Sequence, residues 1–360
     1  MNEHKAESMR RATALAESVR IGQREVGPGQ PCYIVAEAGS NHNQSLEMAK
    51  ELIDVAAEAG CDAVKFQTFS AATLYSKRTP RFSYLGDADV YQLIEANELP
   101  RAWQAELFAH AQRRAITFLC SPFDIQAVDE LDEIGVLAYK IASFELVDHA
   151  FLQYIAAKGK PMLLSTGMAN LGDIEEAVAA ILATGNREVA LLHCNSVYPT
   201  PMASVNLRAM ETMRQAFRCA VGFSDHTVGT TISVAAAALG ANVIEKHFTL
   251  SRRLPGPDHG PFALEPDELQ ALVQQIRWTA AALGNGIKTC TPDEMEFARK
   301  GRRSIVAAMD IPAGAVLTAE MLVVKRPGLG IPPKFMALLM GRRVRVDIAA
   351  DEPVTWAHIG

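Results

Sequence analysis

Short apolar segments alternate with longer amphipathic segments from residue 33 to about residue 283, and this alternation restricts the fold more than any other feature of the chain. The short segments are apolar and β-branched over most of their length, which is typical of strands buried on both faces of a parallel sheet. Eight of them occur, at 33–39, 62–69, 115–123, 137–144, 161–167, 188–196, 219–226 and 242–250. The segments between them have apolar residues at helical spacing, as 44–60, 171–185 and 228–240 illustrate.

Eight strand–helix units over about 250 residues predict an α/β fold, the TIM (β/α)8 barrel. A doubly wound open sheet is the alternative, and it is disfavoured because no GxGxxG turn follows the first strand. The expected organisation is an N-terminal extension and hairpin at 1–32, the barrel at 33–284, a linker at 285–302 and a small β-rich unit at 303–360. Within the first segment, residues 6–19 are expected to form a short polar helix outside the main fold.

The β-rich unit at 303–360 contains an internal repeat. DIPAGAVLTAEML (310–322) and DIAADEPVTWAHI (347–359) align with Asp, Ile, Ala and Thr in register. The alignment indicates a duplicated small unit.

Composition excludes several classes of protein. Hydrophobic residues make up 49% and charged residues 21% of the chain, as in ordinary globular proteins. A net charge of −6 argues against nucleic-acid binding through a basic face. No apolar run reaches the roughly 18 residues of a membrane span, and the first 20 residues lack the apolar core of a secretory signal. The 6 cysteines form no CxxC pair, so we expect a reducing, cytoplasmic location without membrane partners.

Polar side chains lie at the C-terminal ends of the predicted strands, where TIM-barrel active sites lie. Lys65 and Gln67 share one face of the second strand, because residues two apart on a strand point the same way. Glu245 and His247 share a face of the eighth strand in the same manner. A single charged residue often reaches solvent instead. Several at equal depth predict a ligand site, because unpaired buried charges are costly.

His226 and His247 end the seventh and eighth strands. Neighbouring strands lie about 4.8 Å apart, so two imidazoles at equal height can converge on one cation. A lone strand histidine is more often structural than a metal ligand. The pair, with no nearby cysteine, favours a catalytic ion with open coordination positions over structural zinc.

Lys65 and Lys140 suit two chemistries. A buried lysine can form a Schiff base with a carbonyl substrate, and a pair of lysines can equally hold phosphate and carboxylate groups as fixed charges. Hydroxyl donors near four strand ends favour the interpretation as an anion site. They are Ser121, Ser143, Ser165 and Ser224. The whole set suits a ligand with several negative charges.

Taken in order, the motifs at these strand ends resemble those of the N-acetylneuraminate (sialic acid) synthase family, which includes pseudaminic and legionaminic acid synthases. They are AEAGSNH (36–42), KFQTF (65–69), SPF (121–123), KIAS (140–143), LSTGM (164–168), YPTP (198–201), SDHT (224–227), EKHFT (245–249), PDH (257–259), RRS (302–304) and KRPGLG (325–330). The resemblance covers residues from about 19 to 360. It implies a TIM barrel followed by an antifreeze-like (SAF, β-clip) domain, and a homodimer in which the C-terminal domain of each chain caps the barrel of its partner.

The resemblance implies a transferase that forms a carbon–carbon bond. Phosphoenolpyruvate condenses with the open-chain aldehyde of an N-acetylated hexosamine, which gives a nonulosonic (sialic-type) acid and phosphate. Phosphoenolpyruvate would be held by Lys65, Ser121, Lys140, Ser143, Ser165 and Ser224. His226 and His247 would bind a divalent metal, typically manganese, with magnesium and cobalt as the other candidates.

The resemblance also implies which residues surround the sugar. Glu37, Gln67, Tyr198 and Asp258 would lie around the sugar and the reacting centre, and Glu145 would transfer a proton or position water. Arg326 of the partner subunit would reach the acyl amide of the sugar. The general base stays open between Glu37, Glu145 and Asp258.

The chain departs from the family pattern at three places. Gln44 replaces a glycine of the strand-1 loop, Phe144 replaces a glycine of the sialic acid branch, and GLG (328–330) replaces GNG. The last two leave the acceptor open between N-acetylmannosamine and a 2,4-diacetamido-trideoxyhexose.

Two other functions remain as alternatives. A Schiff-base pyruvate aldolase would use Lys65 or Lys140, and it is disfavoured because an imine-forming lysine needs apolar neighbours that lower its pKa. A catalytically silent sugar-binding or ice-binding protein is disfavoured by the many arginines and lysines of the C-terminal unit, which suit a lid over an anionic site.

Overall fold

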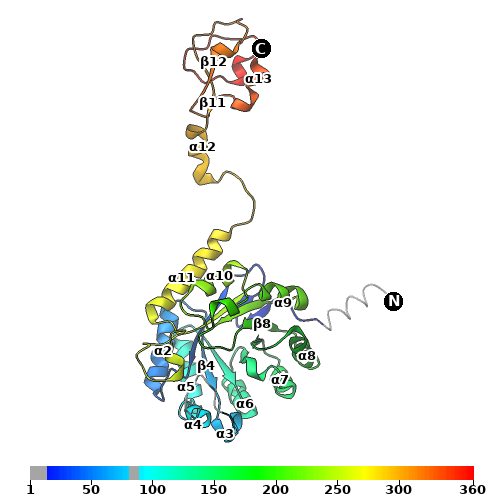
Figure 1. Cartoon of the computed structure of the whole chain (residues 1–360), viewed down its shortest axis with the longest axis vertical. Coiled ribbons are helices and arrows are strands. Elements are labelled where there is room, and N and C mark those ends of the chain that lie inside the picture. The colour runs from blue at the N-terminus through cyan, green and yellow to red at the C-terminus, as the bar shows by residue number, and fades with distance from the viewer. Residues whose placement is uncertain (1–13, 81–88) are drawn as a thin grey trace, which may run out of the picture. The chain divides into compact units, whose positions relative to one another are not determined.

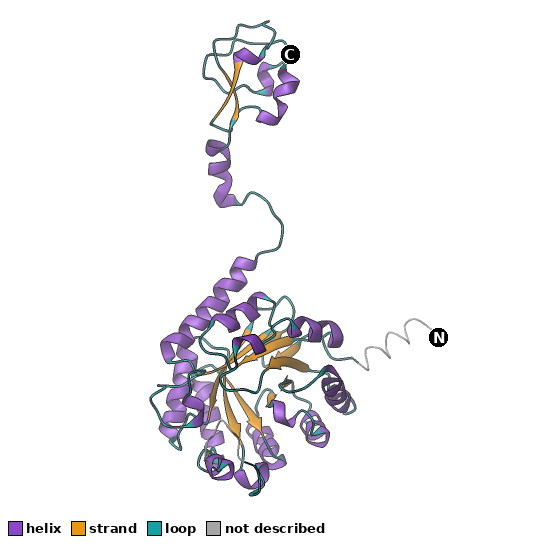
Figure 2. Cartoon of the chain, in the orientation of Figure 1, coloured by secondary structure: helices purple, strands orange, loops and turns teal. Residues whose placement is uncertain are grey.

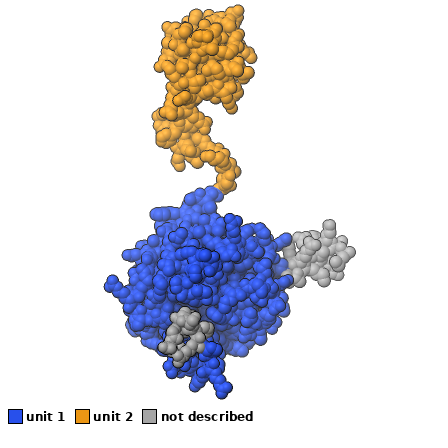
Figure 3. Space-filling model, viewed as in Figure 1, with its two compact units in different colours: residues 1–284 blue, residues 285–360 orange. Residues whose placement is uncertain are grey.

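The computed structural model describes residues 14–80 and 89–360. The chain divides into two compact units, residues 1–284 and residues 285–360, which Figure 3 draws in different colours. Each unit has a hydrophobic core of its own.

The described part of the first unit contains a sheet of eight parallel strands with helices outside it (Figures 1 and 2). The strands are β3 (Tyr33–Gly39), β4 (Ala63–Thr68), β5 (Thr117–Pro122), β6 (Tyr139–Ile141), β7 (Met162–Ser165), β8 (Val189–Cys194), β9 (Val221–Asp225) and β10 (Val243–His247). Their order is β5-β4-β3-β10-β9-β8-β7-β6, and β5 also lies beside β6, so the sheet forms a nearly closed barrel. The predicted TIM barrel is therefore confirmed, and each predicted strand segment contains one of these strands.

Helices follow the strands and cover the outside of the barrel (Figure 2). They are α2 (Leu46–Glu58), α3 (Ala71–Leu74), α4 (Val90–Glu95), α5 (Gln104–Arg113), α6 (Ile125–Ile134), α7 (His149–Ala156), α8 (Leu171–Leu182), α9 (Ala209–Phe217), α10 (Thr231–Ala238) and α11 (Pro266–Leu283). α2 shows why the predicted helix at 44–60 forms. Ser45 caps its N-terminus by accepting a hydrogen bond from the Met48 N–H. Gly60, at φ 82°, turns the chain toward β4.

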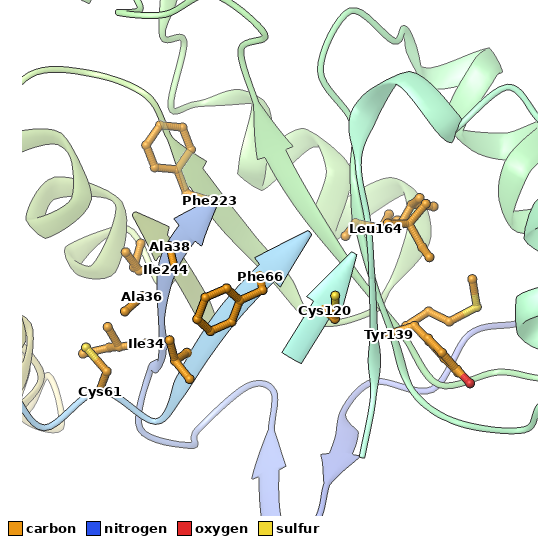
Figure 4. Packing of buried hydrophobic residues seen from close by; sticks show 14 of the residues in the cluster. Ile34, Ala36, Ala38, Cys61, Phe66, Cys120, Tyr139, Leu164, Phe223 and Ile244 are labelled. Atoms are coloured by element: carbon orange, nitrogen blue, oxygen red, sulfur yellow. The ribbon is translucent and has the colours of Figure 1, made fainter. Parts of the chain in front are cut away.

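The outward-facing side chains of the strands pack against these helices. Figure 4 shows this layer, with Ile34, Ala36 and Ala38 on β3, Phe66 on β4 and Ile244 on β10. All five are fully buried, so one continuous apolar layer holds the helices to the barrel.

The inward-facing side chains near the N-terminal ends of the barrel strands form a second apolar cluster. It contains Tyr33, Val35, Ala63, Leu119, Ala138, Leu163, Ala190, Leu192, Ala220 and Val243. An antiparallel hairpin of β1 (Val19–Ile21) and β2 (Arg24–Val26) adds Val19, Ile21 and Val26 to this cluster. The hairpin thereby closes the N-terminal end of the barrel.

The polar helix predicted at 6–19 lies largely outside the described residues. Where the chain is described the prediction is wrong, because 14–18 is not helical and Val19 begins β1. Leu15 is buried in the main core, and the Ala16 N–H donates to the Arg187 carbonyl at 2.9 Å. This stretch is therefore part of the barrel unit and not an appendage.

The second unit contains α12 (Met295–Gly301), the antiparallel pair β11 (Ser304–Ala307) and β12 (Leu322–Lys325), and α13 (Met336–Leu339). The two copies of its internal repeat pair with each other in the structure. Ile311 and Ile348 exchange both backbone hydrogen bonds at 2.9 Å. The Asp347 carboxylate accepts from the Ala313 N–H and the Asp310 carboxylate from the Ala350 N–H, each at 2.7 Å.

None of the described helices combines the length and the apolar character that are needed to cross a membrane.

Candidate active site

A polar layer lies directly above the inner apolar cluster of the barrel. Side chains on a strand alternate between its faces, so the residue two positions after each inward apolar residue also points inward. Val35, Ala63, Leu119, Ala138, Leu163 and Val243 are followed in this way by Glu37, Lys65, Ser121, Lys140, Ser165 and Glu245. The strand alternation that builds the core thus also builds the site, at the C-terminal end of the barrel.

This layer lines a pocket with an empty volume of about 370 Å³, which we call the inner pocket. It is lined by Glu37, Lys65, Gln67, Ser121, Lys140, Ala142, Ser143, Phe144, Ser165, Cys194, Ser196, Tyr198, Ser224, His226, Glu245 and His247. Of the sequence-predicted site residues, the structure leaves three outside this pocket, namely Glu145, Asp258 and Arg326.

Two lysines and two glutamates pair inside the inner pocket. Lys65 Nζ lies 2.7 Å from Glu37 Oε2 and 3.9 Å from Glu245 Oε2. Lys140 Nζ lies 3.4 Å from Glu245 Oε1. Glu245 therefore bridges both lysines, and all four side chains are almost fully buried. Such a cluster is costly unless each charge has a partner.

The charges shift the pKa values of these groups in different directions. Burial alone would lower the pKa of Lys65, but the carboxylates of Glu245 and Glu37 outweigh it and raise that pKa. Burial lowers the pKa of Lys140, and Glu245 offsets this only in part. Burial would raise the pKa of Glu245, yet Lys140 and Lys65 hold it at about 2. Lys65 is thus a firmly held positive charge, whereas the pKa of Lys140 lies below its usual value because burial outweighs the attraction of Glu245.

Burial raises the pKa of Glu37, and Lys65 opposes that effect. The amide of Gln67 fixes the same carboxylate by donating to Oε1 at 2.6 Å. Glu37 is therefore held by two side chains of β4, which places its charge at a defined point in the pocket.

The predicted serines lie around the two lysines. Ser121 accepts a hydrogen bond from Lys65 Nζ at 3.3 Å, and Ser224 donates to Glu245 Oε1 at 2.9 Å. Ser143 accepts from the Gly167 N–H at 2.9 Å. The Ser165 hydroxyl is buried and has no partner among the described residues. A buried hydroxyl without a partner is free to donate to a ligand.

His226 and His247 lie next to each other at the ends of β9 and β10, with ring centroids 5.3 Å apart. His226 Nδ1 donates to the Asn195 carbonyl at 2.8 Å, which leaves Nε2 as an acceptor. Burial lowers the pKa of His247 to about 4, so its ring is neutral, and its Nδ1 is buried without a partner.

Imidazole nitrogens are suitable ligands for a divalent cation. Among the described residues, no group of three or more His, Cys, Asp or Glu side chains is arranged to hold a metal. An ion on His226 and His247 alone would take its remaining ligands from water or substrate.

A second pocket adjoins the inner one, and we call it the outer pocket. It is lined by Ser40, Gln67, Phe69, Leu74, Tyr75, Val90, Leu93, Ile94, Asn97, Phe123, Ala142, Phe144, Tyr198, His247, Pro257, Asp258 and Phe262. Gln67, Ala142, Phe144, Tyr198 and His247 line both pockets, so the two are continuous.

Tyr198 and Asp258 both face the outer pocket. The Tyr198 ring lies against His226, with centroids 4.1 Å apart. Asp258 Oδ2 accepts hydrogen bonds from both the backbone N–H and the hydroxyl of Ser40, each at 2.8 Å. Ser40 follows Gly39, so the loop after β3 fixes this carboxylate.

Glu145 and Arg326 lie elsewhere. Glu145 belongs to the short 3-10 helix Ser143–Glu145 and lines neither pocket. Burial raises its pKa to about 7, and its Oε2 has no hydrogen-bond partner among the described residues. Arg326 is exposed, directly after β12 in the second unit.

Glu245, Cys194 and Ser196 also line the inner pocket. The two-residue alternation placed Glu245 among the strand-end charges that predicted a ligand site, but gave it no individual role, and Cys194 and Ser196 were not predicted. Cys194 follows the inward Leu192 by two residues in the same manner. Its thiol lies 3.8 Å from His226 Nδ1.

A charge-paired polar pocket at the C-terminal end of a TIM barrel defines this protein as a TIM-barrel enzyme. The chain belongs to the NeuB family, whose family model matches residues 52–288, and the SAF domain matches residues 302–360. The resemblance found in the sequence and the C-terminal SAF domain are thus confirmed.

Named relatives cover almost the whole chain. The N,N'-diacetyllegionaminic acid synthase of Campylobacter jejuni is 42% identical over 326 residues, which are 89% of this chain and 97% of that protein. The N,N'-diacetyllegionaminic acid synthase of Legionella pneumophila is 38% identical over 347 residues, which are 94% of this chain and 97% of that protein. A crystal structure of N-acetylneuraminic acid synthetase from Leptospira borgpetersenii matches with a TM-score of 0.70 at 32% identity and covers 79% of this chain and 95% of that one.

Proposed function

We propose that this chain condenses phosphoenolpyruvate with the open-chain aldehyde of an N-acetylated hexosamine to give a nonulosonic acid and phosphate. The acceptor is N-acetylmannosamine or a 2,4-diacetamido-trideoxyhexose. The observation that carries the proposal is the inner pocket, in which two buried lysines and a set of serine hydroxyls adjoin His226 and His247. The names of the relatives, which are synthases of such acids, support the same reaction.

Phosphoenolpyruvate is assigned to the inner pocket. Lys65 is held in its charged form and can bind a phosphate or carboxylate as a fixed charge. The unpartnered Ser165 hydroxyl supplies a free donor in the same pocket. The other proposed contacts are Ser121, Lys140, Ser143 and Ser224.

The proposed metal is manganese, with magnesium and cobalt as the other candidates, and its ligands are His226 and His247. When bound, the metal supplies a Lewis acid that polarises the aldehyde oxygen of the acceptor. Tyr198, stacked against His226, restricts the space beside that imidazole.

In the proposed reaction, C3 of phosphoenolpyruvate forms the new bond to the aldehyde carbon, and the aldehyde oxygen takes a proton. Positive charge then develops at C2, where the carboxylates of Glu37 and Glu245 stabilise it. Water adds to C2 and loses a proton to a base. The C2–O bond to phosphate then breaks, so that phosphate leaves and the keto group forms.

The base is one of Glu37, Asp258 and Glu145. Glu37 lines the inner pocket and Asp258 lines the outer one. Glu145 lines neither pocket, but its pKa of about 7 suits a group that exchanges protons near neutral pH.

We also propose a cytosolic homodimer in which the domain at 303–360 of each chain covers the barrel at 33–284 of its partner. The segment 285–302 links the barrel and the C-terminal domain within each chain, and residues 1–32 form the extension and hairpin. Exposed apolar side chains around the linker support an interface with a second copy, because Ile287 and Phe297 are 72% and 75% exposed. In this arrangement Arg326 of the partner subunit contacts the acyl amide of the sugar.

The test is phosphate release from phosphoenolpyruvate and manganese with each candidate sugar, with and without a chelator. Release is expected to need both a sugar and the metal. His226→Ala and His247→Ala are each expected to lose at least tenfold in manganese affinity, measured by calorimetry, because each removes one of two protein ligands. Full activity in metal-stripped enzyme would contradict the proposal.

The Schiff-base alternative is tested in the same preparation, because the lowered pKa of Lys140 suits imine formation. Borohydride with pyruvate is expected to leave no covalent adduct. An adduct on Lys140 would replace the proposed reaction with aldolase chemistry.

A further inference from the structure

The outer pocket has a wall made of apolar side chains from four segments of the chain. It consists of Phe69 after β4, Leu74 on α3, Val90, Leu93 and Ile94 on α4, and Phe123 after β5. The rings of Phe69 and Phe123 pack edge to face with centroids 5.9 Å apart. We call these six residues the apolar wall.

Polarity changes along the outer pocket. Three of the residues that it shares with the inner pocket, Gln67, Tyr198 and His247, carry hydrogen-bonding groups. None of the wall residues lines the inner pocket. Outside the wall and the shared residues, the outer pocket is lined by Ser40, Tyr75, Asn97, Pro257, Asp258 and Phe262. Hydrogen-bonding groups therefore lie beside the apolar wall but are not part of it.

The proposed reaction determines how an acceptor must lie across these pockets. Phosphoenolpyruvate takes the inner pocket, with its charges on the lysines. The aldehyde carbon must reach it near His247 and Tyr198, which line both pockets. The far end of the sugar, C4 to C6, then extends into the outer pocket and toward the apolar wall.

We propose that the apolar wall selects an acceptor whose far end carries a methyl group and an N-acyl group instead of hydroxyls. Of the two candidates, that is the 2,4-diacetamido-trideoxyhexose. This inference rests on the proposed condensation and specifies its sugar substrate.

The physical reason is the cost of removing hydroxyl groups from water. N-acetylmannosamine would place its C6 hydroxyl against wall side chains that offer no hydrogen-bond partner. A methyl group in the same place gains from the contact. An apolar pocket discriminates such pairs by about 10- to 200-fold in kcat/KM.

The test compares kcat/KM for the two sugars at saturating phosphoenolpyruvate and manganese. We expect a preference of about 100-fold for the trideoxy sugar. Phosphate release with equal efficiency for both, or a preference for N-acetylmannosamine, overturns the inference and leaves the proposed condensation intact. Release with neither sugar overturns the condensation, and this inference with it.

Two variants test the wall itself. Leu93→Asn is close in size and adds polar groups, and we expect it to lower kcat/KM for the trideoxy sugar about tenfold or more. Its affinity for phosphoenolpyruvate is expected to stay unchanged, because Leu93 does not line the inner pocket. Leu239→Asn is the matched control, because Leu239 is 54% exposed after α10 and lines neither pocket.

Val90→Thr provides a second substitution in case Leu93→Asn impairs folding, since it changes one buried methyl group to a hydroxyl. Like Leu93→Asn, it is expected to reduce the preference for the trideoxy sugar over N-acetylmannosamine. An unchanged preference in a folded Leu93→Asn or Val90→Thr variant overturns the assignment of the wall.

Discussion

At the scale of single residues, Gly39 makes room for a carboxylate of the site. Its φ is 53°, and a Cβ at this position would lie 2.4 Å from Asp258 Oδ2. Asp258 in turn accepts two hydrogen bonds from Ser40, the next residue in the chain. A side chain at position 39 would therefore displace the carboxylate from Ser40.

We expect Gly39→Ala to lower kcat/KM for the condensation at least tenfold, because it misplaces Asp258. Gly29→Ala is the control. Gly29 also has a positive φ of 78°, but an added Cβ would meet no atom within 4 Å. Both variants are expected to lose about 1 kcal/mol of folding stability, because alanine is strained at a positive φ. Urea unfolding measures this loss. Equal activity of the two variants would show that the position of Asp258 does not matter.

Glu145 gives the stability of the protein a dependence on pH. Burial raises its pKa from 4.5 to about 7 in the folded state. Between these two values the folded state binds more protons than the unfolded state, so stability falls as the pH rises through this range.

Glu145→Gln removes this effect. We expect the variant to be more stable than the wild type by about 2 kcal/mol at pH 8, because the shift of about 2.5 units sets a limit near 3 kcal/mol and the side chain is only partly buried. The difference is expected to vanish below about pH 4.5. Urea unfolding of both proteins at pH 4.5 and pH 8 measures it. A stability difference of the same size at both pH values would contradict the raised pKa of Glu145 as its cause.

Most inner-pocket residues were predictable from the two-residue period of the strands, as Lys65 and Gln67 illustrate. The bridging position of Glu245 was not predictable, because it depends on β10 lying between β9 and β3 in the closed sheet. Gln44, which replaces a glycine of the family pattern, keeps a positive φ of 56°, as a glycine at this position would allow. Its side-chain amide donates to the Glu98 carbonyl.

At the scale of secondary-structure elements, a buried ion pair joins β9, β10 and α10. Lys246 Nζ lies 3.2 Å from Asp225 Oδ2, and both side chains are fully buried on the outer side of the barrel. Asp225 also accepts from the Ser233 hydroxyl at 2.6 Å and from the Thr227 N–H at 2.7 Å. The pair directly precedes His226 and His247 in the chain, so it fixes the backbone of both.

Lys246→Met is expected to destabilise the barrel by about 3 to 5 kcal/mol, because it leaves the Asp225 carboxylate buried without a counter-ion. The double variant Asp225→Asn with Lys246→Met is expected to recover most of this loss, since no buried charge remains. Urea unfolding of the two variants and the wild type gives the comparison. A double variant as unstable as the single one would show that packing, and not charge, is what the pair contributes.

The strands were predicted more accurately than the N-terminal segment. Buried parallel strands give continuous apolar runs such as 33–39, which became β3 without change. The segment 6–19 was expected to form a short polar helix outside the main fold. In its described part, from residue 14, tertiary contacts decide the course of the chain instead, since Leu15 and Val19 are buried against the barrel.

At the scale of the whole molecule, the chain is two units that each bury their own core. The second unit owes its core to the pairing of its two repeats, which bring Ile311 and Ile348 together. The repeat was visible in the sequence, but the pairing was not, because residues 310 and 347 meet only in the folded unit. Arg326 belongs to this second unit, whereas the charged pocket belongs to the first.

The proposed dimer requires that each active site draws residues from both chains. Arg326→Ala alone is expected to lower kcat/KM by about 10- to 100-fold, because it removes a charged hydrogen bond to the sugar amide. His226→Ala alone is expected to be inactive because it removes a metal ligand.

Co-expression of these two variants with different affinity tags then tests whether Arg326 acts on its own barrel or on that of the partner. If it acts on the partner, each mixed dimer contains one intact site, formed by the barrel with His226 and the domain with Arg326. Random pairing makes half of the dimers mixed, so about a quarter of the wild-type activity is expected to return. If Arg326 acts on its own barrel, no mixed dimer contains an intact site. Activity no greater than that of the separate variants would therefore contradict the swapped arrangement, and His226→Ala mixed with the double variant is the inactive control.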